Sequence, residues 1–347
     1  MELRRLGRTD LQVPPICLGA MMFGDQIDEP ESHRQLDACF ERGVNFIDTA
    51  EMYTIPPKPE TQGESERIIG RWVSSRRVRE KVIIASKVIG RSGFTYLRNG
   101  AETRLTRNQI FTAIERSLQN LQTDYIDLYQ THWPDRRAQM FGSSLYGYVH
   151  YDEPGAPIEE TLGALDELVK QGKIRHAGVS NETPYGVMRH LQSADKNDLP
   201  RIVTIQNAYN LLNRTFENGL AEIALEEHVG LLAYSPIAQG VLTGKYLQGA
   251  KPKGSRGELF GRLGRYEKPG ADDAIEHYLN LAKQFDLSPA VFAMAFVTSR
   301  PFVTSNIFGA NGESQLDQIF QSLNVDWTEE MEKAVNEVFA RFQSPCP

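Results

Sequence analysis

Four side chains that can give or take a proton stand at or just beyond the ends of apolar runs in this sequence. Asp48 closes the run VNFID, and the phenol of Tyr53 follows shortly after it. Lys87 ends VIIASK, and His132 ends YIDLYQTH. Each residue alone has an ordinary structural use, since a terminal Asp caps turns, a Tyr packs and a Lys extends along apolar surface to water. Together, an acid, a phenol, an amine and an imidazole favour acid and base chemistry.

Alternating strand and helix patterns surround these residues. Eight short apolar runs are typical of buried strands: 16–19, 44–48, 82–87, 125–132, 174–180, 202–207, 231–236 and 303–309. Between them, apolar residues three or four apart predict helices, among them 32–43, 65–75, 107–121, 158–173 and 216–230. No G-x-G-x-x-G follows any of the strands. The eightfold alternation of strand and helix therefore predicts an α/β fold of the (β/α)8 TIM barrel type rather than an open sheet.

The ends of the chain extend this prediction. The turn Gly-Arg-Thr-Asp near the N-terminus predicts a β-hairpin that closes the barrel floor. Because no linker or repeat interrupts the pattern, we expect one domain over residues 1–347. In such a barrel the carboxyl ends of the strands meet at one mouth, where barrel enzymes carry out their chemistry. We therefore expect the four side chains, from the second, third and fourth strands, to converge there.

The composition describes a soluble globular protein. Hydrophobic residues make up 40% and charged residues 24% of the 347, the mean hydropathy is -0.41, and no stretch approaches the roughly 18 apolar residues of a membrane span. A net charge of -7 argues against a nucleic-acid partner, because phosphate binding needs a basic face. The N-terminus lacks a signal-peptide core, so a cytoplasmic location is expected. Three scattered cysteines argue against disulfides and zinc.

Longer motifs around these residues resemble the aldo-keto reductase superfamily, with its bacterial Tas-type proteins and its potassium-channel β-subunit branch. The resemblance covers nearly the whole chain and is carried by LGRTDLQVPPICLGAMMFG, NFIDTAEMY, VIIASKV, SLQNLQTDYIDLYQTHWP, GKIRHAGVSNE, IQNAYNLLNR, LLAYSPIAQGVLTGKY and IFGANGESQL. It implies an NADP-dependent oxidoreductase that reduces aldehydes or ketones. The family's catalytic Asp, Tyr, Lys and His match Asp48, Tyr53, Lys87 and His132 without departure.

These four residue types suit hydride chemistry on a carbonyl group. Hydride arriving at the carbonyl carbon places negative charge on the oxygen, so the site needs a proton donor. By resemblance Tyr53 is that donor, and the ammonium of Lys87 is expected to lower its pKa from about 10. Asp48 would pair with Lys87 and hold it in place, while neutral His132 would orient the carbonyl oxygen.

The resemblance also implies a site for NADPH/NADP+. Ser180, Asn181 and Gln206 match the residues that bind the nicotinamide carboxamide, and Tyr234 matches the ring that stacks on the nicotinamide, although a plain core role is the alternative for this Tyr. Further cofactor-binding residues implied by the match are Gly19, Ala20, Met21, Asp48, Ser235, Pro236, Ile237, Ala238, Gly240, Gly309, Ala310 and Gln315.

Basic residues in a Gly-rich and Lys-rich loop indicate which nicotinamide cofactor is used. The resemblance places Lys245 and Arg256 near the 2′-phosphate, and a guanidinium suits this group because it can give a phosphate two parallel charged hydrogen bonds. The alternative is an exposed basic loop without a ligand. One departure concerns adenine, since the family's Glu-Asn pair that clasps this base is replaced by Gln318 and Ile319.

The loop after the fourth strand, residues 133–157, is rich in aromatic residues and is a candidate wall of the substrate pocket. A surface Ω-loop packed by its own aromatic side chains is an equal alternative. The expected substrate-pocket residues are Met22, Phe23, Tyr53, Trp133, Tyr146 and Tyr148.

Two classes of function fit these residues. The first is an NADPH-dependent reductase with a small-molecule carbonyl substrate, and the second is a cofactor-sensing binding module of the channel β-subunit kind with little turnover. A metal-dependent hydrolase is rejected, because the strand ends show no cluster of His, Asp and Glu with metal-ligand spacing. No metal, nucleic acid or membrane is expected as a partner, and the sequence makes no prediction about an oligomeric partner.

Overall fold

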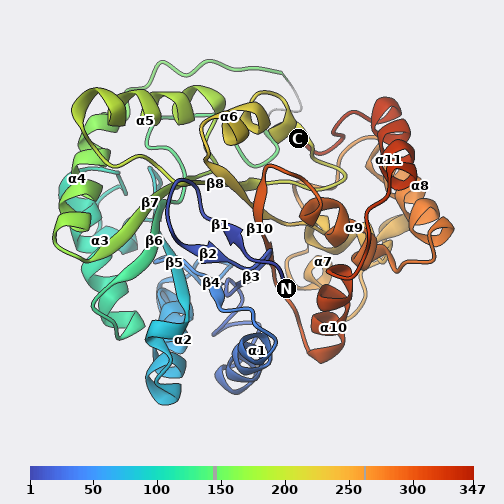
Figure 1. The fold of residues 1–347 in the computed structure, drawn as a ribbon, viewed down its shortest axis with the longest axis horizontal. Helices are drawn as coiled ribbons and strands as arrows, with labels where there is room; N and C mark the ends of the chain where they lie inside the picture. Colours follow the sequence, from blue (N-terminus) through green and yellow to red (C-terminus); the bar gives the residue numbers. More distant parts are fainter. Residues whose placement is uncertain (144–146, 262) are drawn as a thin grey trace.

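The computed structural model describes residues 1–143, 147–261 and 263–347 and shows a closed barrel of parallel strands. The order around the barrel follows the chain from β3 to β10, and β10 then pairs with β3 to close it. The predicted (β/α)8 barrel is therefore confirmed (Figure 1). The strand bounds are β3 Ile16–Gly19, β4 Phe46–Asp48, β5 Ile83–Val88, β6 Ile126–Thr131, β7 Ile174–Ser180, β8 Thr204–Ala208, β9 Gly230–Tyr234 and β10 Val303–Phe308.

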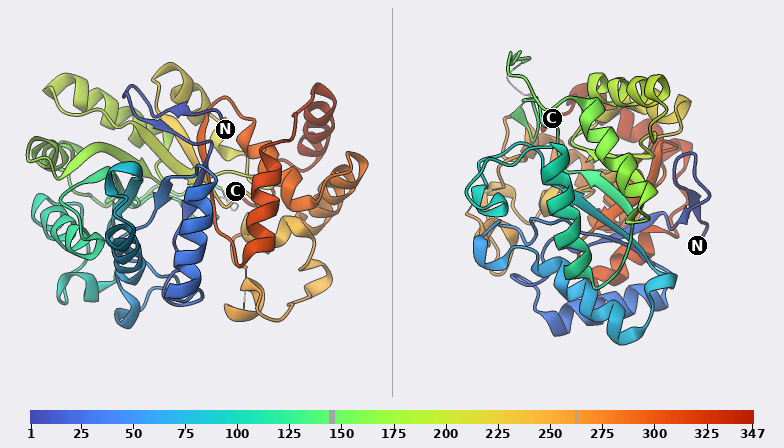
Figure 2. Two further views of the ribbon diagram at one scale, coloured as in Figure 1. Left: turned by 60° about the horizontal axis from the view of Figure 1, so that its bottom comes forward. Right: turned by 90° about the vertical axis from the view of Figure 1, so that its left-hand side faces the viewer.

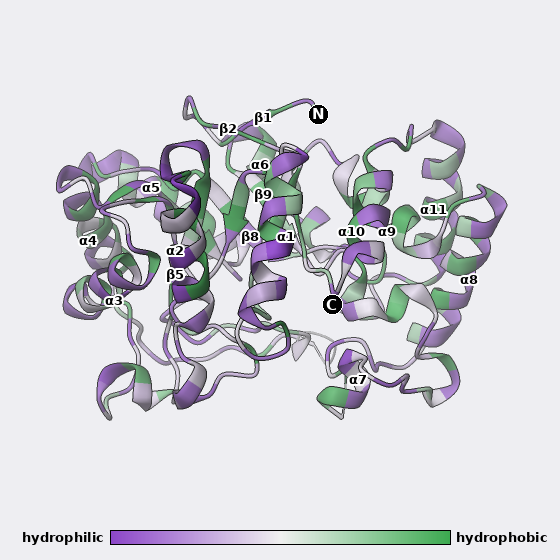
Figure 3. Ribbon diagram, turned by 90° about the horizontal axis from the view of Figure 1, so that it is seen from below, coloured by the Kyte–Doolittle hydropathy of each residue, from purple (hydrophilic) through white to green (hydrophobic). Residues whose placement is uncertain are grey.

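Helices lie around the outside of the barrel (Figures 1 and 2). Most of them carry both hydrophobic and hydrophilic residues, whereas β9 is mostly hydrophobic (Figure 3). This pattern is what a helix needs in order to bury one face against a sheet. The helix bounds are α1 Glu29–Glu41, α2 Glu64–Arg76, α3 Arg107–Leu121, α4 Ile158–Lys170, α5 Pro184–Asn197, α6 Leu220–Glu226, α7 Arg256–Leu259, α8 Ala271–Gln284, α9 Pro289–Thr298, α10 Glu313–Ser322 and α11 Glu329–Arg341.

The structure differs from the predicted elements in two places. The helix predicted over 216–230 begins only at Leu220, because Gly219 has a φ of 98° that a helix cannot contain. Helices α5 and α7 to α11 lie outside the five ranges named from the sequence; of these, α9 has no polar face to give a period, because its residues 291–298 are all buried. The ends of the predicted strands differ from the observed ones by at most two residues, which is the usual uncertainty of such bounds.

A hairpin closes the end of the barrel at which the strands begin, as predicted. Leu6 is fully buried there and packs in one cluster with Phe46, the first residue of β4. The guanidinium of Arg4 donates a 2.7 Å hydrogen bond to the carbonyl of Val303, the first residue of β10. The short helix α7 lies at the opposite end of the barrel from this hairpin (Figure 3). The hairpin pairs two antiparallel strands, β1 Arg4–Arg5 and β2 Gln12–Val13.

None of the helices in the described ranges is long and apolar enough to cross a membrane. The three cysteines are free and buried. No group of three or more His, Cys, Asp and Glu side chains within the described residues could hold a metal ion.

Candidate active site

The structure brings the four proton-carrying side chains together at the mouth of the barrel. Asp48 is the last residue of β4, Lys87 lies near the end of β5, and His132 directly follows β6. Tyr53 comes from the loop after β4. All four are nearly inaccessible to water, with exposed fractions of 3% for Asp48, 8% for Tyr53, 0% for Lys87 and 8% for His132. Charges in such a place are tolerated only when they are paired.

Lys87 and Asp48 form a buried ion pair. The Nζ of Lys87 lies 2.6 Å from Oδ2 of Asp48 and donates a second hydrogen bond, of 2.7 Å, to the carbonyl of Thr49. The other carboxylate oxygen of Asp48 accepts a 2.8 Å hydrogen bond from the side-chain amide of Gln206. Burial lowers the pKa of Lys87, but the negative charge of Asp48 and the phenol of Tyr53 outweigh it and raise the pKa above its usual value. Lys87 therefore carries its positive charge at neutral pH.

Tyr53 lies between this ammonium and an imidazole. The Nζ of Lys87 is 4.9 Å from the centroid of the Tyr53 ring. The hydroxyl of Tyr53 is 3.5 Å from Nε2 of His132, and the two rings meet edge to face. Burial raises the pKa of Tyr53 by more than Lys87 lowers it, so this pKa lies above its usual value. The sequence-based expectation of a lowered pKa is wrong. The phenol is therefore protonated at neutral pH and can donate its proton.

His132 is held in its neutral form. Burial, followed by the positive charges of Lys87 and Arg265, keeps the pKa of His132 well below its usual value. Its backbone is fixed on both sides, because its amide donates to Val88 and its carbonyl accepts from the side chain of Asn181. A neutral imidazole carries one N–H donor and one acceptor nitrogen, which suits it to orient an oxygen without transferring a full charge.

Glu51 lies on the same loop as Tyr53, and the structure gives it a partner that sequence analysis did not find. Its carboxylate accepts two hydrogen bonds from the guanidinium of Arg98, of 2.8 and 2.7 Å, and one of 2.8 Å from the backbone N–H of Ile89, just past β5. Glu51 and Arg98 are both buried. Nothing in the local pattern points to Arg98, which is 47 residues away in the chain. Through Glu51, the loop that carries Tyr53 is fastened to Arg98 and, by the hydrogen bond from Ile89, to the end of the strand that carries Lys87.

The residues matched to the nicotinamide carboxamide form a connected polar wall beside His132. The side chain of Asn181 donates to the carbonyl of His132 at 2.8 Å and accepts a 2.6 Å hydrogen bond from the hydroxyl of Tyr234. The hydroxyl of Ser180 donates to the carbonyl of Gln206 at 2.7 Å. The ends of β7, β8 and β9 are thus joined to one another next to the imidazole.

A tight loop follows β9 directly. Ser235 has a φ of 58° and Ala238 a φ of 49°, both in the left-handed region, and Gly240 has a φ of 94°. Two backbone hydrogen bonds of 2.8 Å close successive turns: the N–H of Ala238 donates to the carbonyl of Ser235, and the N–H of Gly240 donates to that of Ile237. Pro236, also matched to the cofactor, is buried within it. Successive residues with positive φ can leave backbone N–H groups turned toward one concave side, an arrangement that favours anions.

Two cations near the barrel mouth, Lys245 and Arg256, have no acidic partner among the residues that the structure describes. Within the described part of the chain, neither Lys245 nor Arg256 takes part in an ion pair; their charges instead lie 5.1 Å and 5.0 Å from the ring centroids of Tyr246 and Phe260. Burial, and then the charge of Arg265, lowers the pKa of Arg256. Arg256 begins α7, at the mouth end of the barrel (Figure 3). Such unpaired cations fit a phosphate group.

The first barrel strand ends in closely packed small residues. A Cβ at Gly19 would lie 2.9 Å from a side-chain carbon of Ile307, so a larger residue would push the two neighbouring strands apart. Ala20 is buried, and Phe23 is 1% exposed and belongs to the core between barrel and helices. Met21 and Met22 are half-buried.

The end of β10 faces this strand. A Cβ at Gly309 would lie 3.4 Å from the terminal methyl group of Met22, and Ala310 is buried. The side chain of Gln315 accepts a 2.9 Å hydrogen bond from the backbone N–H of Asn311 and so braces its own loop. Of the pair that departs from the family pattern, Ile319 is buried in the core and Gln318 is half-buried.

The residues expected to line a substrate pocket lie in different environments. Trp133 is almost buried, its ring centroid is 4.9 Å from that of His132, and its indole N–H donates to the carbonyl of Arg91 at 3.0 Å. Tyr148 is 82% exposed and hydrogen-bonds to His150 in its own loop. Tyr146 lies outside the described residues. One part of the loop after β6 thus packs at the site, and another faces solvent.

Arg265 is a second residue that the sequence did not single out. Its guanidinium donates a 3.0 Å hydrogen bond to the hydroxyl of Tyr234 and lies 4.3 Å from the ring centroid of Phe141. Arg265, Tyr234, Phe141 and Asn181 line a cavity of about 200 Å³. A single Arg among turn residues forms no recognisable sequence motif, so its position beside the site is seen only from its contacts with Tyr234 and Phe141.

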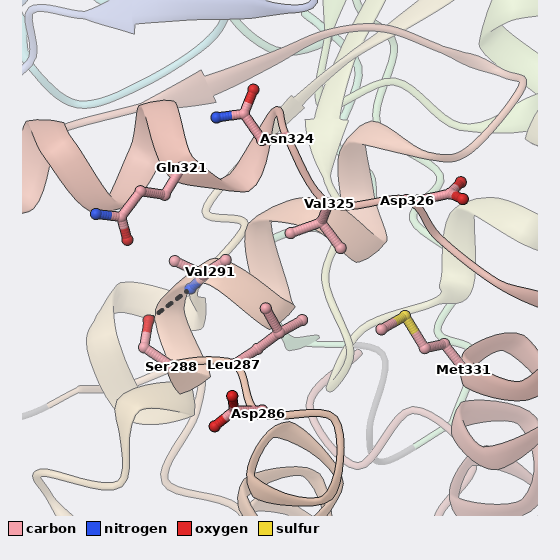
Figure 4. Close-up of a pocket in the computed structure, with 9 residues that line it drawn as sticks. All are labelled: Asp286, Leu287, Ser288, Val291, Gln321, Asn324, Val325, Asp326 and Met331. Carbon is pink, nitrogen blue, oxygen red and sulfur yellow. Dashed lines mark hydrogen bonds between the residues drawn. The ribbon is translucent and has the colours of Figure 1, made fainter.

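A further hollow lies among the outer helices, away from these residues. It has a volume of about 390 Å³ and is lined from α9, α10, α11 and their connections (Figure 4). None of the strand-end side chains described above lines it. The candidate active site is therefore at the barrel mouth.

Fold and site together define a barrel protein with a buried ion pair, a phenol and a neutral imidazole at its mouth. A sequence model of the Aldo/keto reductase family matches residues 15–340, and the chain belongs to this family. It is 46% identical to Protein tas of Escherichia coli (strain K12) over the full length of both chains. It is 31% identical to the uncharacterized oxidoreductase YrpG of Bacillus subtilis, over 98% of this chain and 96% of that one.

A third relative belongs to the channel branch. The chain is 30% identical to a probable voltage-gated potassium channel subunit beta of Arabidopsis thaliana, over 94% of this chain and 92% of the relative. The resemblance found in the sequence is therefore confirmed, and the protein is an oxidoreductase of a family that generally uses NAD(P)H.

Proposed function

We propose that the protein reduces aldehydes or ketones to alcohols with NADPH and that Tyr53 is the proton donor. One arrangement of four side chains carries this proposal: the ammonium of Lys87, paired with Asp48 at 2.6 Å, lies under the ring of Tyr53, whose hydroxyl is next to Nε2 of His132. Four groups with different pKa values, all shielded from water, suit a reaction in which one of them gives its proton to the carbonyl oxygen of the substrate. We also propose that residues 1–347 work as a single domain in the cytoplasm.

The roles of the four side chains follow from their charges. NADPH, when bound, supplies the hydride that forms the new C–H bond at the carbonyl carbon. Neutral His132 donates a hydrogen bond that orients the carbonyl oxygen. Tyr53 gives its proton to that oxygen as negative charge develops there, which yields the alcohol and leaves a phenolate. Lys87 stabilises the phenolate, and Asp48 keeps Lys87 in place.

The residues around the mouth fit a nicotinamide cofactor with a 2′-phosphate. Ser180, Asn181 and Gln206 offer hydroxyl and amide groups to the carboxamide, and the ring of Tyr234 is available for stacking. Lys245 and Arg256, which lack acidic partners among the described residues, would hold the phosphate. The loop of residues 235–240 would follow the pyrophosphate.

A second candidate function has support from one comparison. The relative from Arabidopsis thaliana carries the name of a channel subunit, and it aligns over nearly the whole chain. A protein of that kind would bind the cofactor and grip another protein, with little turnover. The complete set of Asp48, Tyr53, Lys87 and His132 favours the reductase.

Steady turnover separates the two functions. NADPH absorbance is followed after addition of a simple aromatic aldehyde in large excess over the enzyme. The reductase predicts continued NADPH loss over many turnovers and no change on adding Mg²⁺ or Zn²⁺. NADPH loss that stops at one equivalent per protein chain would favour the cofactor-sensing module instead.

A further inference from the structure

Arg265 presents a positive charge beside the candidate active site. Its guanidinium donates to the hydroxyl of Tyr234 at 3.0 Å, and that hydroxyl donates to Asn181, which in turn is bonded to the carbonyl of His132. The ring of Phe141 lies 4.3 Å away on another side. The ring centroids of Phe141 and Trp133 are 6.1 Å apart, and the ring of Trp133 packs against that of His132. The guanidinium is therefore fixed by neutral groups close to the four proton-carrying side chains.

No acid among the described residues neutralises this charge, and this includes the terminal carboxylate of Pro347, which lines the same cavity as Arg265 but forms no ion pair with it. Over the described ranges, no carboxylate oxygen lies within ion-pair distance of Arg265, and the only hydrogen bond of its guanidinium in these ranges is the one to the hydroxyl of Tyr234. Glu182 lines the same cavity, but both of its oxygens are bound by the guanidinium of Arg136, at 2.5 and 3.0 Å. A half-buried guanidinium without a counter-charge is costly, and a bound anion would offset that cost.

The cavity beside Arg265 suits an organic anion. It has a volume of about 200 Å³, and its lining combines the aromatic rings of Phe141 and Tyr234 with the polar side chains of Asn181 and Thr183. Polar and apolar residues are mixed in this lining, and fixed polar groups in such a cavity orient a small molecule and give specificity. A guanidinium binds a carboxylate through two parallel charged hydrogen bonds, and here four of its donors are not committed to the protein.

We infer that Arg265 binds a carboxylate group of the substrate, so that the preferred substrates are aldehydes or ketones that carry a carboxylate. This inference rests on the proposed reductase function and gives its substrate a chemical class. The cofactor's phosphates are the other source of an anion near Arg265. They would be served by Lys245 and Arg256, which have no acidic partner in the described ranges either.

A matched pair of substrates tests the inference. 4-Carboxybenzaldehyde carries a carboxylate, and its methyl ester is of similar shape without the charge. We expect wild type to have a higher kcat/KM for the acid. Arg265→Ala should reduce the acid-to-ester ratio by about tenfold to a hundredfold, with little change for the ester, since charged hydrogen bonds have that strength. Arg265→Lys should keep part of the preference, because it keeps the charge.

Two control variants separate this site from its surroundings. Arg137 is an exposed arginine of the loop after β6, and Arg137→Ala should leave the ratio unchanged. Arg256→Ala should weaken NADPH binding but leave the acid-to-ester ratio as in wild type. If Arg265→Ala instead weakens NADPH and leaves the ratio intact, the charge serves the cofactor and the inference is wrong.

Binding without turnover keeps the test independent of the reductase function. Calorimetric titration with benzoate and with benzamide, with and without NADP+, compares an anion and a neutral molecule of the same size. Wild type should bind benzoate at least tenfold more tightly, and Arg265→Ala should bind both equally weakly. Equal binding of benzoate by wild type and Arg265→Ala would overturn the inference. Absence of turnover with every aldehyde, together with Arg265-dependent benzoate binding, would contradict only the proposed reductase.

Discussion

The carboxylate of Asp48 is held from both sides: Oδ2 pairs with the ammonium of Lys87 at 2.6 Å, and Oδ1 accepts from the amide of Gln206 at 2.8 Å. The position of the ammonium under Tyr53 therefore depends on strands β4, β5 and β8 together. The charge of Lys87 lowers the pKa of the Tyr53 phenol directly, whereas Asp48 holds Lys87 in place and its own negative charge raises that pKa.

This difference predicts an order of damage. In Lys87→Met the ammonium no longer opposes burial, which is the main influence on the pKa of Tyr53, so this pKa should rise further. We expect the variant to lose measurable activity near neutral pH and its pH–rate profile to shift to higher pH. Asp48→Asn should be milder, because the ammonium keeps its 2.7 Å hydrogen bond to the carbonyl of Thr49. The pH–rate profiles of both variants provide the check. Greater damage from Asp48→Asn would contradict the role of Lys87 as the group that tunes Tyr53.

Glu51 should affect catalysis through the position of Tyr53. Glu51→Gln leaves the buried guanidinium of Arg98 without its counter-charge, and breaking a buried pair typically costs about 3–5 kcal/mol of stability. We expect kcat to fall and KM to change little, because Gln can still accept the hydrogen bond from Ile89 but no longer pairs with Arg98, which loosens the loop that carries Tyr53. Glu60→Gln, an exposed acid of the same loop, is the control and should change neither quantity. Unaltered kcat in a destabilised Glu51→Gln would mean that the pair serves the fold alone.

Arg256 should set the choice between NADPH and NADH. Hydrogen bonds to a charged group contribute about 1.5–3 kcal/mol each, so Arg256→Ala should weaken NADPH by roughly tenfold to a hundredfold. NADH lacks the phosphate and should bind as before. The replacement of the family's Glu-Asn pair by Gln318 and Ile319 concerns adenine, which both cofactors carry, so it should affect the binding of NADPH and NADH alike. Fluorescence titration of wild type and variant with each cofactor tests this, and equal affinity of wild type for both would disprove the assignment.

Glu332 should contribute to stability in acid. Hydrogen bonds from Arg300 lower the pKa of Glu332 to about 2, from a usual 4.5. Because the folded pKa is the lower one, the contribution is complete above pH 4.5 and is lost as the pH falls toward 2. Since a third of the side chain is exposed, Glu332→Gln should cost only about 1 kcal/mol at pH 7.

Urea unfolding at a series of pH values measures this effect. The free energy of unfolding of wild type should fall more steeply between pH 4.5 and 2 than that of Glu332→Gln, which has no carboxyl group to titrate there. Glu337→Gln, at an exposed position of the same helix, should follow wild type. Parallel curves for all three proteins would show that the pairing with Arg300 does not contribute.

The sequence predicted the barrel because parallel strands are buried on both faces and appear as short apolar runs, such as the one that ends at Asp48. It also predicted that Asp48, Lys87 and His132 would meet, since their positions at strand ends follow from the fold. It did not predict the partner of Glu51 or the place of Arg265. These depend on contacts between loops distant in the chain, which no local period encodes. The raised pKa of Tyr53 depends on how completely the fold buries it.

Single-turnover hydride transfer in Tyr53→Phe tests the central claim most directly. The enzyme is first saturated with NADPH, an aldehyde is added, and the first loss of NADPH absorbance is timed by rapid mixing. The ring and its packing remain in this variant, so NADPH affinity should be nearly that of wild type. If Tyr53 is the proton donor, hydride transfer should slow by about 10²-fold to 10⁴-fold. A variant that keeps most of the wild-type rate would show that the proton comes from another group.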